Sequence, residues 1–254
     1  MSIPKCRHCQ DRAPLPFDFS MAFQPIVDVE RGSVWAYEAL VRGTDGAGAY
    51  SVLSQVNETN RYQFDQACRV KAIELAAQLF LEGDAKLSIN FMPNAVYEPA
   101  SCIRASLDAA ERTSFPRERL MFEFTETEQT RDVAHLQKIL KEYSRHGFIT
   151  AIDDFDAGFS GLGLLADFRP DVVKIDMHLV RDIGDDFGRR AIVAGIIGML
   201  NALDITVIAE GIERAEECAM LRRAGVRLFQ GYHFAKPAFE ALPDIANLDL
   251  AEAA

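Results

Sequence analysis

The sequence contains no hydrophobic run long enough to span a membrane and few features of a secreted protein. Its longest apolar stretch, at residues 191–200, is too short to cross a bilayer and is broken by glycine. No signal peptide is visible at the start. The five cysteines are odd in number and irregularly spaced, which argues against a disulfide framework. We therefore expect a cytoplasmic protein without a membrane anchor.

The sequence also has few basic residues relative to acidic ones, and it lacks histidine motifs that bind metals. The chain has 27 Lys and Arg against 38 Asp and Glu, a net charge of −11, which disfavours nonspecific binding of DNA or RNA. A bound cation can still reverse the local sign and admit a small phosphorylated ligand. The five histidines show neither HxH nor HExxH spacing. Cys6 and Cys9 form one CxxC pair, but no second pair follows at zinc-site spacing, so we expect ordinary thiols.

What the chain does contain is a regular alternation of strand-like and helix-like segments. Helical spacing of apolar residues occurs at residues 62–81, 95–111, 132–146, 186–202 and 214–224. Eight β-prone runs are found at residues 21–29, 34–41, 86–91, 119–125, 148–153, 171–175, 205–209 and 227–231. This order predicts an α/β fold, a TIM-like (β/α)8 barrel.

The first two predicted strands are joined by a short turn and not by a helix, so one of them should run antiparallel. A doubly wound open sheet is the alternative architecture, but the Gly-rich dinucleotide fingerprint that would favour it is absent after the first strand. We expect an N-terminal tail at residues 1–17, one folded domain at residues 18–245 and a C-terminal tail at residues 246–254.

Polar residues lie at or near the C-terminal ends of seven successive predicted strands. In barrel enzymes these ends form the active site. An isolated pair of aspartates is more often a turn or a helix cap, but the neighbouring strands make a shared site the better interpretation. In strand order the residues are Glu38, Asn90, Glu123, the pair Asp153 and Asp154, Lys174, Glu210 and Gln230.

These side chains are rich in oxygen, which favours Mg²⁺ or Mn²⁺ over zinc. Carboxylates and an amide can hold two ions about 3.5–4 Å apart, an arrangement that serves phosphoester hydrolysis by in-line attack of an activated water. A nearby lysine, here Lys174, can hold that water or neutralise charge on the phosphoryl oxygens. Without metal the carboxylates would repel one another strongly.

The motifs around these residues resemble those of the EAL domain family, phosphodiesterases that act on cyclic di-GMP. The resemblance covers about residues 20–240, and its specificity comes from the order of the motifs along the chain. They are FQPIVD at 23–28, YEALVR at 37–42, SINFMP at 88–93, EFTE at 123–126, DDFDAGFSGL at 153–162, VKID at 173–176, AEGIE at 209–213 and QGYHFAKP at 230–237. The family fold is a TIM-like barrel with one antiparallel strand, which agrees with the expectation above.

The resemblance implies a role for each matching residue. The metal ligands would be Glu38, Asn90, Glu123, Asp153, Asp154 and Glu210, with Asp153 bridging two Mg²⁺ or Mn²⁺ ions. Lys174 would contact the hydrolytic water, and Glu126 would pin the loop after the aspartate pair. The substrate would be bound by Gln24, Arg42 and Gln230. Asp176 and Glu213 are equally well explained as structural carboxylates.

One position departs from the family pattern. Where the family usually has Gly after DDF, this chain has Asp156, which tolerates positive φ less well than glycine and adds negative charge. Asp156 could therefore alter the conformation of this loop and the rate of hydrolysis, but all of the expected metal ligands are retained. The hypothesis is therefore an active phosphodiesterase that opens cyclic di-GMP to linear pGpG.

Two other functions stay open at this stage. One is a weak or inactive EAL domain that serves as a cyclic di-GMP receptor or a protein-interaction module. The other, against which the motifs argue, is a barrel hydrolase for a different phosphoester. The resemblance also implies a homodimer. No sensory or cyclase domain is visible in the sequence, so regulation would come from the N-terminal tail, from dimerisation or from a partner protein in trans; alternatively the sequence is a fragment of a longer protein.

Overall fold

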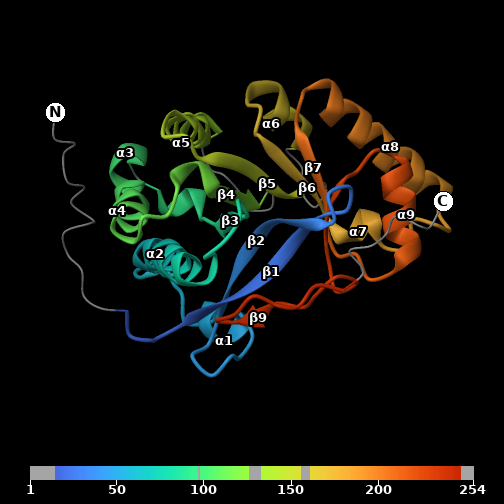
Figure 1. Cartoon of the computed structure of the whole chain (residues 1–254). Helices are drawn as coiled ribbons and strands as arrows, with labels where there is room; N and C mark the ends of the chain where they lie inside the picture. Colours follow the sequence, from blue (N-terminus) through green and yellow to red (C-terminus); the bar gives the residue numbers. More distant parts are fainter. Residues whose placement is uncertain (1–14, 97, 126–132, 156–160, 247–254) are drawn as a thin grey trace.

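Eight strands of the computed structural model close into a barrel, which confirms the predicted fold (Figure 1). The structure describes residues 15–96, 98–125, 133–155 and 161–246. The strands follow one another around the barrel and β1 closes it between β2 and β8, antiparallel to both, while the other neighbours are parallel. The strands are β1 (Ser20–Asp28), β2 (Ser33–Arg42), β3 (Lys86–Asn90), β4 (Leu120–Thr125), β5 (Ile149–Phe155), β6 (Val172–Ile175), β7 (Thr206–Ala209) and β8 (Leu228–Gln230).

Helices surround the barrel and connect its parallel strands (Figure 1). The long ones are α2 (Arg61–Leu79), α4 (Arg104–Thr113), α5 (Val133–Arg145), α8 (Phe187–Ala202) and α9 (Ala215–Arg223). The predicted helix at residues 95–111 was wrong in its extent. A 3-10 turn η2 (Pro93–Ala95) is followed by α3 (Pro99–Cys102) and then α4, because Pro99 stands at the first position of a new helix.

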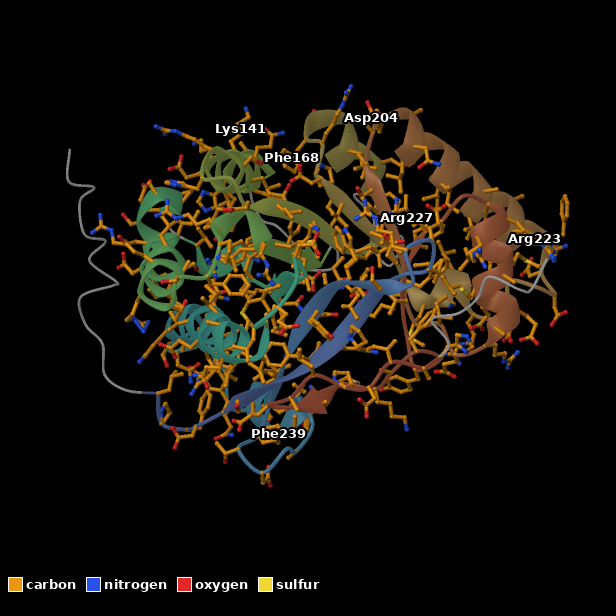
Figure 2. All side chains as sticks on the ribbon, in the orientation of Figure 1. Lys141, Phe168, Asp204, Arg223, Arg227 and Phe239 are labelled. Carbon is orange, nitrogen blue, oxygen red and sulfur yellow. The ribbon has the colours of Figure 1, made fainter. Side chains whose placement is uncertain are left out.

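Several short elements were not predicted, because each has too few residues to show a period. They are α1 (Tyr50–Leu53), η3 (Arg117–Arg119), α6 (Gly161–Asp167), α7 (Met177–Val180) and β9 (Ala238–Phe239). The strand β9 pairs antiparallel with β1 outside the barrel order. Figure 2 places Phe239 on this strand, on the side of the molecule away from Lys141 and Asp204.

The core has two parts, as the twofold alternation of a barrel strand requires. One face of each strand packs outward against the helices in a large cluster that includes Phe23, Phe122, Ile152 and Val173. The other face points into the barrel, where a smaller cluster fills the interior. No helix in the described part of the chain combines the length and apolarity that crossing a bilayer requires.

The N-terminal end of the parallel strands is closed by an ion pair. Asp28, at the end of β1, is buried and accepts hydrogen bonds from the backbone of Glu30 and Arg31. The Arg227 Nε donates to Asp28 Oδ1 at 2.7 Å, directly before β8 begins. These contacts join β1 to β8 at the end of the barrel opposite the polar strand ends. They therefore serve barrel closure and leave the other end free for chemistry.

Candidate functional site

The polar residues at the strand ends form a second layer inside the barrel, above the apolar one. The lower layer consists of Ile26, Ala36, Met121, Ala151, Val172, Ile208 and Leu228. Side chains two residues apart on a strand share a face. Two residues further toward the C-terminal end of the barrel, in the same order, lie Gln24, Glu38, Glu123, Asp153, Lys174, Glu210 and Gln230.

This layering explains one expectation that was wrong. Glu38 was predicted near the end of its strand, but β2 continues to Arg42, so Glu38 lies in the middle. It reaches the site because it is two residues beyond the inward-facing Ala36. Asn90, two residues beyond the buried Ser88, ends β3 and meets Glu38 from the neighbouring strand. A residue therefore belongs to the site because its side chain points into the barrel, and not because it stands at the end of its strand.

The adjacent carboxylates of Asp153 and Asp154 need a backbone irregularity to point to the same region. Asp154 has φ of +52°, in the left-handed region, and the register between β5 and β6 shifts between Ile152 and Phe155. Such a bulge re-aims a side chain that would otherwise face outward. A carboxylate oxygen from each of Asp153, Asp154 and Glu210 lies within 4.8 Å of the others. The predicted convergence of the aspartate pair is thus confirmed.

Lys174 lies at the centre of the polar layer and is 1% exposed. Its Nζ lies 2.7 Å from Glu210 Oε1, 3.1 Å from Glu123 Oε2 and 3.1 Å from Asp153 Oδ1. Glu38 Oε2 is 3.4 Å from the same nitrogen. One ammonium group thus faces four carboxylates, and the surplus negative charge leaves room for further cations.

Three amides complete the layer by hydrogen bonding. Asn90 Nδ2 donates to Glu38 Oε1 at 2.8 Å and to Glu123 Oε1 at 3.1 Å. Gln230 Nε2 donates to Glu38 Oε2 at 2.7 Å and to Gln24 Oε1 at 3.3 Å. Gln24 Nε2 in turn donates to the carbonyl of Ala235 at 3.3 Å. These bonds orient Glu38 and tie β1, β2, β3 and β8 into one network.

Burial and mutual repulsion shift the acidities in this layer. Burial, opposed by Lys174 and reinforced by neighbouring carboxylates, holds the pKa of Glu123 and of Glu210 well above its usual range. Glu38 is the exception, because Lys174, Gln230 and Asn90 outweigh burial and lower its pKa. Burial, the Asp153 charge and the hydrogen bond with Asp176 raise the pKa of Asp154 to about 7. Four carboxylates raise the pKa of Lys174 well above its usual range against the effect of burial, so it stays charged.

The donor set fits hard divalent cations. Carboxylate and amide oxygens are the ligands that Mg²⁺ and Mn²⁺ prefer, and three carboxylate oxygens already converge at Asp153, Asp154 and Glu210. The raised pKa values show that the protein alone does not balance these charges. A bound cation would relieve this repulsion.

A cavity of about 390 Å³ opens above the acidic layer. Besides predicted residues it is lined by Met177, Gly211, Gly231 and Tyr232, which were not predicted as site residues. Gly211 has φ of +64°, and a Cβ there would lie 2.2 Å from the Cβ of Met177, so the close approach requires glycine. Tyr232 could have been predicted from the sequence, because it stands two residues after the site residue Gln230.

Asp176 and Glu213 both line this cavity and both have structural partners. Asp176 caps α7 by accepting from the backbone N–H of His178 at 2.7 Å. Glu213 receives two hydrogen bonds from Arg181, at 2.7 and 2.8 Å. A bidentate pair of this kind fixes the segment that follows β7.

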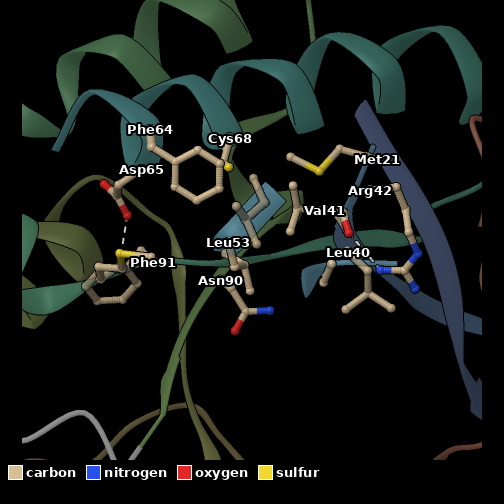
Figure 3. A pocket seen from close by; sticks show the side chains of 14 residues that line it. Met21, Leu40, Val41, Arg42, Leu53, Phe64, Asp65, Cys68, Asn90 and Phe91 are labelled. Atoms are coloured by element: carbon tan, nitrogen blue, oxygen red, sulfur yellow. Dashed lines mark hydrogen bonds between the residues drawn. The ribbon is translucent and has the colours of Figure 1, made fainter. Parts of the chain in front are cut away.

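A second, larger cavity of about 540 Å³ adjoins the site and shares Asn90 with it. Figure 3 shows mainly apolar side chains around it, including Met21, Phe64 and Phe91. Arg42 lies on one wall, where its Nη1 donates to the carbonyl of Val41 at 2.7 Å. The structure thus places Arg42 on this cavity and the other predicted substrate residues, Gln24 and Gln230, on the acidic one.

Three predictions fall on residues outside the described ranges: the loop-pinning role of Glu126, the departure at Asp156, and the thiols Cys6 and Cys9. The described cysteines, Cys68, Cys102 and Cys218, form no disulfide with one another.

The sequence model of the EAL domain family matches residues 12–237. The chain is similar to a standalone versatile EAL protein from Vibrio cholerae O395 in its c-di-GMP bound form. The two share 54% identity with a TM-score of 0.89 over 94% of this chain and 100% of that one.

Two further relatives are longer proteins. Klebsiella pneumoniae BlrP1, in a complex with manganese and cyclic di-GMP, is 37% identical with a TM-score of 0.83, over 90% of this chain and 59% of that one. The blue light- and temperature-regulated antirepressor BluF of Escherichia coli K12 is 32% identical over 89% of this chain. The chain spans 56% of the length of BluF.

Proposed function

The chain belongs to the EAL domain family, and from that premise we propose that it hydrolyses cyclic di-GMP to linear pGpG with the help of two divalent ions. The observation that carries the proposal is the acidic layer, in which four carboxylates surround one lysine and three carboxylate oxygens lie within 4.8 Å. The relatives bound to cyclic di-GMP, one of them also with manganese, support the substrate class and the kind of ion.

The metal ligands we propose are the six oxygen donors of the layer: Glu38, Asn90, Glu123, Asp153, Asp154 and Glu210. When bound, the two Mg²⁺ or Mn²⁺ ions supply Lewis acidity that activates water and neutralises phosphoryl charge. Asp153 would be shared by the two ions, because it lies between Lys174 and the cluster with Asp154 and Glu210. Asn90 and Gln230 hold Glu38 in place.

Lys174 stays charged, and its ammonium group lies among four carboxylates at the centre of the layer. We assign it to orienting the attacking water and to stabilising the charge that grows on the phosphoryl oxygens. Glu210, the carboxylate nearest to Lys174, holds the ammonium group in place through their ion pair. The role of Glu126, as the residue that fixes the loop after the aspartate pair, stays a prediction.

The substrate has two nucleoside halves, and two cavities lie next to the acidic layer, one lined by Glu38 and Glu210 and the other by Asn90. We propose that one phosphodiester lies above the acidic layer, near Gln24 and Gln230. One nucleoside would then enter the apolar cavity, where Arg42 could turn from Val41 to pair with a phosphate. The planar fork of an arginine suits that contact.

The direct test is incubation of the purified protein with cyclic di-GMP and Mg²⁺ or Mn²⁺, followed by nucleotide chromatography. We expect pGpG with at least one of the two ions and none after chelation. Formation of no pGpG with either ion would overturn the proposal that this chain hydrolyses cyclic di-GMP.

The second candidate is a receptor or an interaction module that binds cyclic di-GMP without hydrolysis. Two observations favour it: the relative BluF is named an antirepressor, and Asp156 replaces the usual glycine. The wild type and Asp156→Gly should therefore be assayed side by side. Calorimetric binding without turnover in the wild type, with turnover gained in Asp156→Gly, would favour the receptor. Homodimerisation and a regulatory partner in trans are further proposals, to be tested by light scattering and by pull-down.

A further inference from the structure

A second buried ion pair lies at the wall of the apolar cavity, which Asp65 helps to line, and outside the acidic layer. Asp65 and Arg69 stand one turn apart on α2 and form an ion pair in which both side chains are at most 1% exposed. Arg69 Nη1 also donates to the hydroxyl of Tyr143 on α5 at 2.6 Å. The guanidinium carbon lies 5.4 Å and 5.7 Å from the ring centroids of Phe91 and Phe122. Arg69 therefore has ionic, hydrogen-bonding and aromatic partners.

The second carboxylate oxygen of Asp65 has a different task. Asp65 Oδ1 accepts a hydrogen bond from the backbone N–H of Met92 at 2.8 Å, where β3 has ended and its ladder bonds are no longer available. Figure 3 shows this bond beside Phe91 and Asn90. One residue earlier, the N–H of Phe91 bonds the carbonyl of Glu123 at 2.9 Å.

The ring of Phe91 is held from the same network. Its centroid lies 5.3 Å from that of Tyr143, the residue that also binds Arg69. The two residues that follow Asn90 are thus both fixed. Met92 is held through its backbone N–H by Asp65, and Phe91 is held through its ring by Arg69 and Tyr143. Asn90 itself is the only link from this segment to Glu38 among the hydrogen bonds of the described residues.

We propose that Asp65, held by Arg69 and Tyr143, is a positioning residue that fixes the chain beyond β3 and thereby aims Asn90 at the acidic layer. The inference rests on the proposed function in one respect, because Asn90 is assigned there as a metal ligand. Groups behind a ligand hold it in the geometry that the ion requires, and their removal weakens metal binding.

Packing alone does not account for this arrangement. A buried ion pair can be replaced by apolar side chains of similar volume without loss of stability. What the charged pair provides here, and apolar side chains would not, is an acceptor for the Met92 N–H. A test must therefore keep the packing while it removes only the acceptor.

The experiment compares two double variants that both lack the charges. Asp65→Asn with Arg69→Met retains a carbonyl oxygen for the Met92 N–H, whereas Asp65→Leu with Arg69→Met has nearly the same volume and no acceptor. Hydrogen exchange of the Met92 amide, measured by NMR, should be about tenfold faster in the Leu variant. The affinity for Mn²⁺, measured by calorimetry, should be about tenfold weaker in the Leu variant, in line with other residues that position metal ligands. Equal exchange and equal affinity in the two variants would overturn the proposal.

A third variant covers the case in which a double variant does not fold. Tyr143→Phe keeps the ring that packs on Phe91 but removes the hydroxyl that holds Arg69. We expect faster exchange confined to residues 88–95, and an unchanged rate in that segment would overturn the proposal. The exchange readout needs no metal. A wild type that binds no Mn²⁺ and forms no pGpG would refute the proposed function, while the exchange comparison still decides the positioning role.

Discussion

Two cationic side chains among the described residues, Arg69 and Lys174, are fully buried, and their surroundings differ in charge balance. Arg69 faces one carboxylate, one phenol and a group of aromatic rings. Lys174 faces four carboxylates within 3.4 Å. The first cluster is balanced in charge, with one carboxylate for one guanidinium, as a structural element should be. The second is overcharged, which costs stability unless a further cation binds. The imbalance thus distinguishes the candidate catalytic site from the scaffold that supports it.

The largest effect is expected when the overcharged cluster loses its central carboxylate. Asp153→Asn removes a charge that contacts Lys174 and belongs to the convergent set with Asp154 and Glu210. We expect turnover of cyclic di-GMP to fall by at least about 10³-fold, because the two-ion arrangement depends on it. Chromatography of the products measures this. The fold should be kept, as judged by circular dichroism, and a variant with near wild-type turnover would contradict the assignment.

Removal of the balanced cation should cost stability instead. Arg69→Met leaves Asp65 buried without its partner, and breaking a buried pair in this way costs about 3–5 kcal/mol. Urea denaturation measures the loss. The double variant Asp65→Asn with Arg69→Met is the control and should recover most of it, because neither charge remains. A single variant as stable as the wild type would show that the pair is not ionised in the folded protein.

Removal of Lys174 should lower the stability by less than removal of Arg69, and bound Mn²⁺ should restore the stability that is lost. In Lys174→Met the metal-free protein should lose about 2 kcal/mol, because the carboxylates lose their counter-charge but can take up protons in compensation. Mn²⁺ should raise the melting temperature of this variant more than that of the wild type. Arg69→Met, measured with and without Mn²⁺, is the matched control, since its stability should respond no more than the wild type does. Equal shifts in all three proteins would remove the distinction between the clusters.

The two clusters also differ in how far the sequence revealed them. Glu123, Lys174 and Glu210 could be recognised because strand ends and a period of two are local features. Asp65 and Arg69 could not, because a charged pair four residues apart on a helix normally faces solvent. Their burial depends on Tyr143, which is distant in the sequence. The left-handed φ of Asp154 was equally hidden, since only the pairing of β5 with β6 requires the bulge.

The most modest effect concerns pH and arises at Asp154. Burial, the Asp153 charge and the hydrogen bond with Asp176 raise its pKa from 3.8 to about 7 in the metal-free protein. The unfolded chain has released this proton above about pH 4. The folded protein keeps it until about pH 7, so this group makes the metal-free protein less stable as pH rises between those values.

Metal binding has the opposite dependence, because a carboxylate must be ionised to act as a ligand. Below pH 7 the affinity for Mn²⁺ should rise about tenfold per pH unit for each proton displaced. Calorimetry at pH 6 in buffers of different ionisation enthalpy counts those protons, and we expect at least one per ion. Asp154→Asn should release about one proton fewer, since Glu210 and Glu123, whose pKa values are also raised, still contribute. If the wild type released no proton at pH 6, Asp154 would already be ionised in the metal-free protein. The protein would then stabilise the carboxylate charges around Lys174 without a bound cation, which would contradict the proposed imbalance.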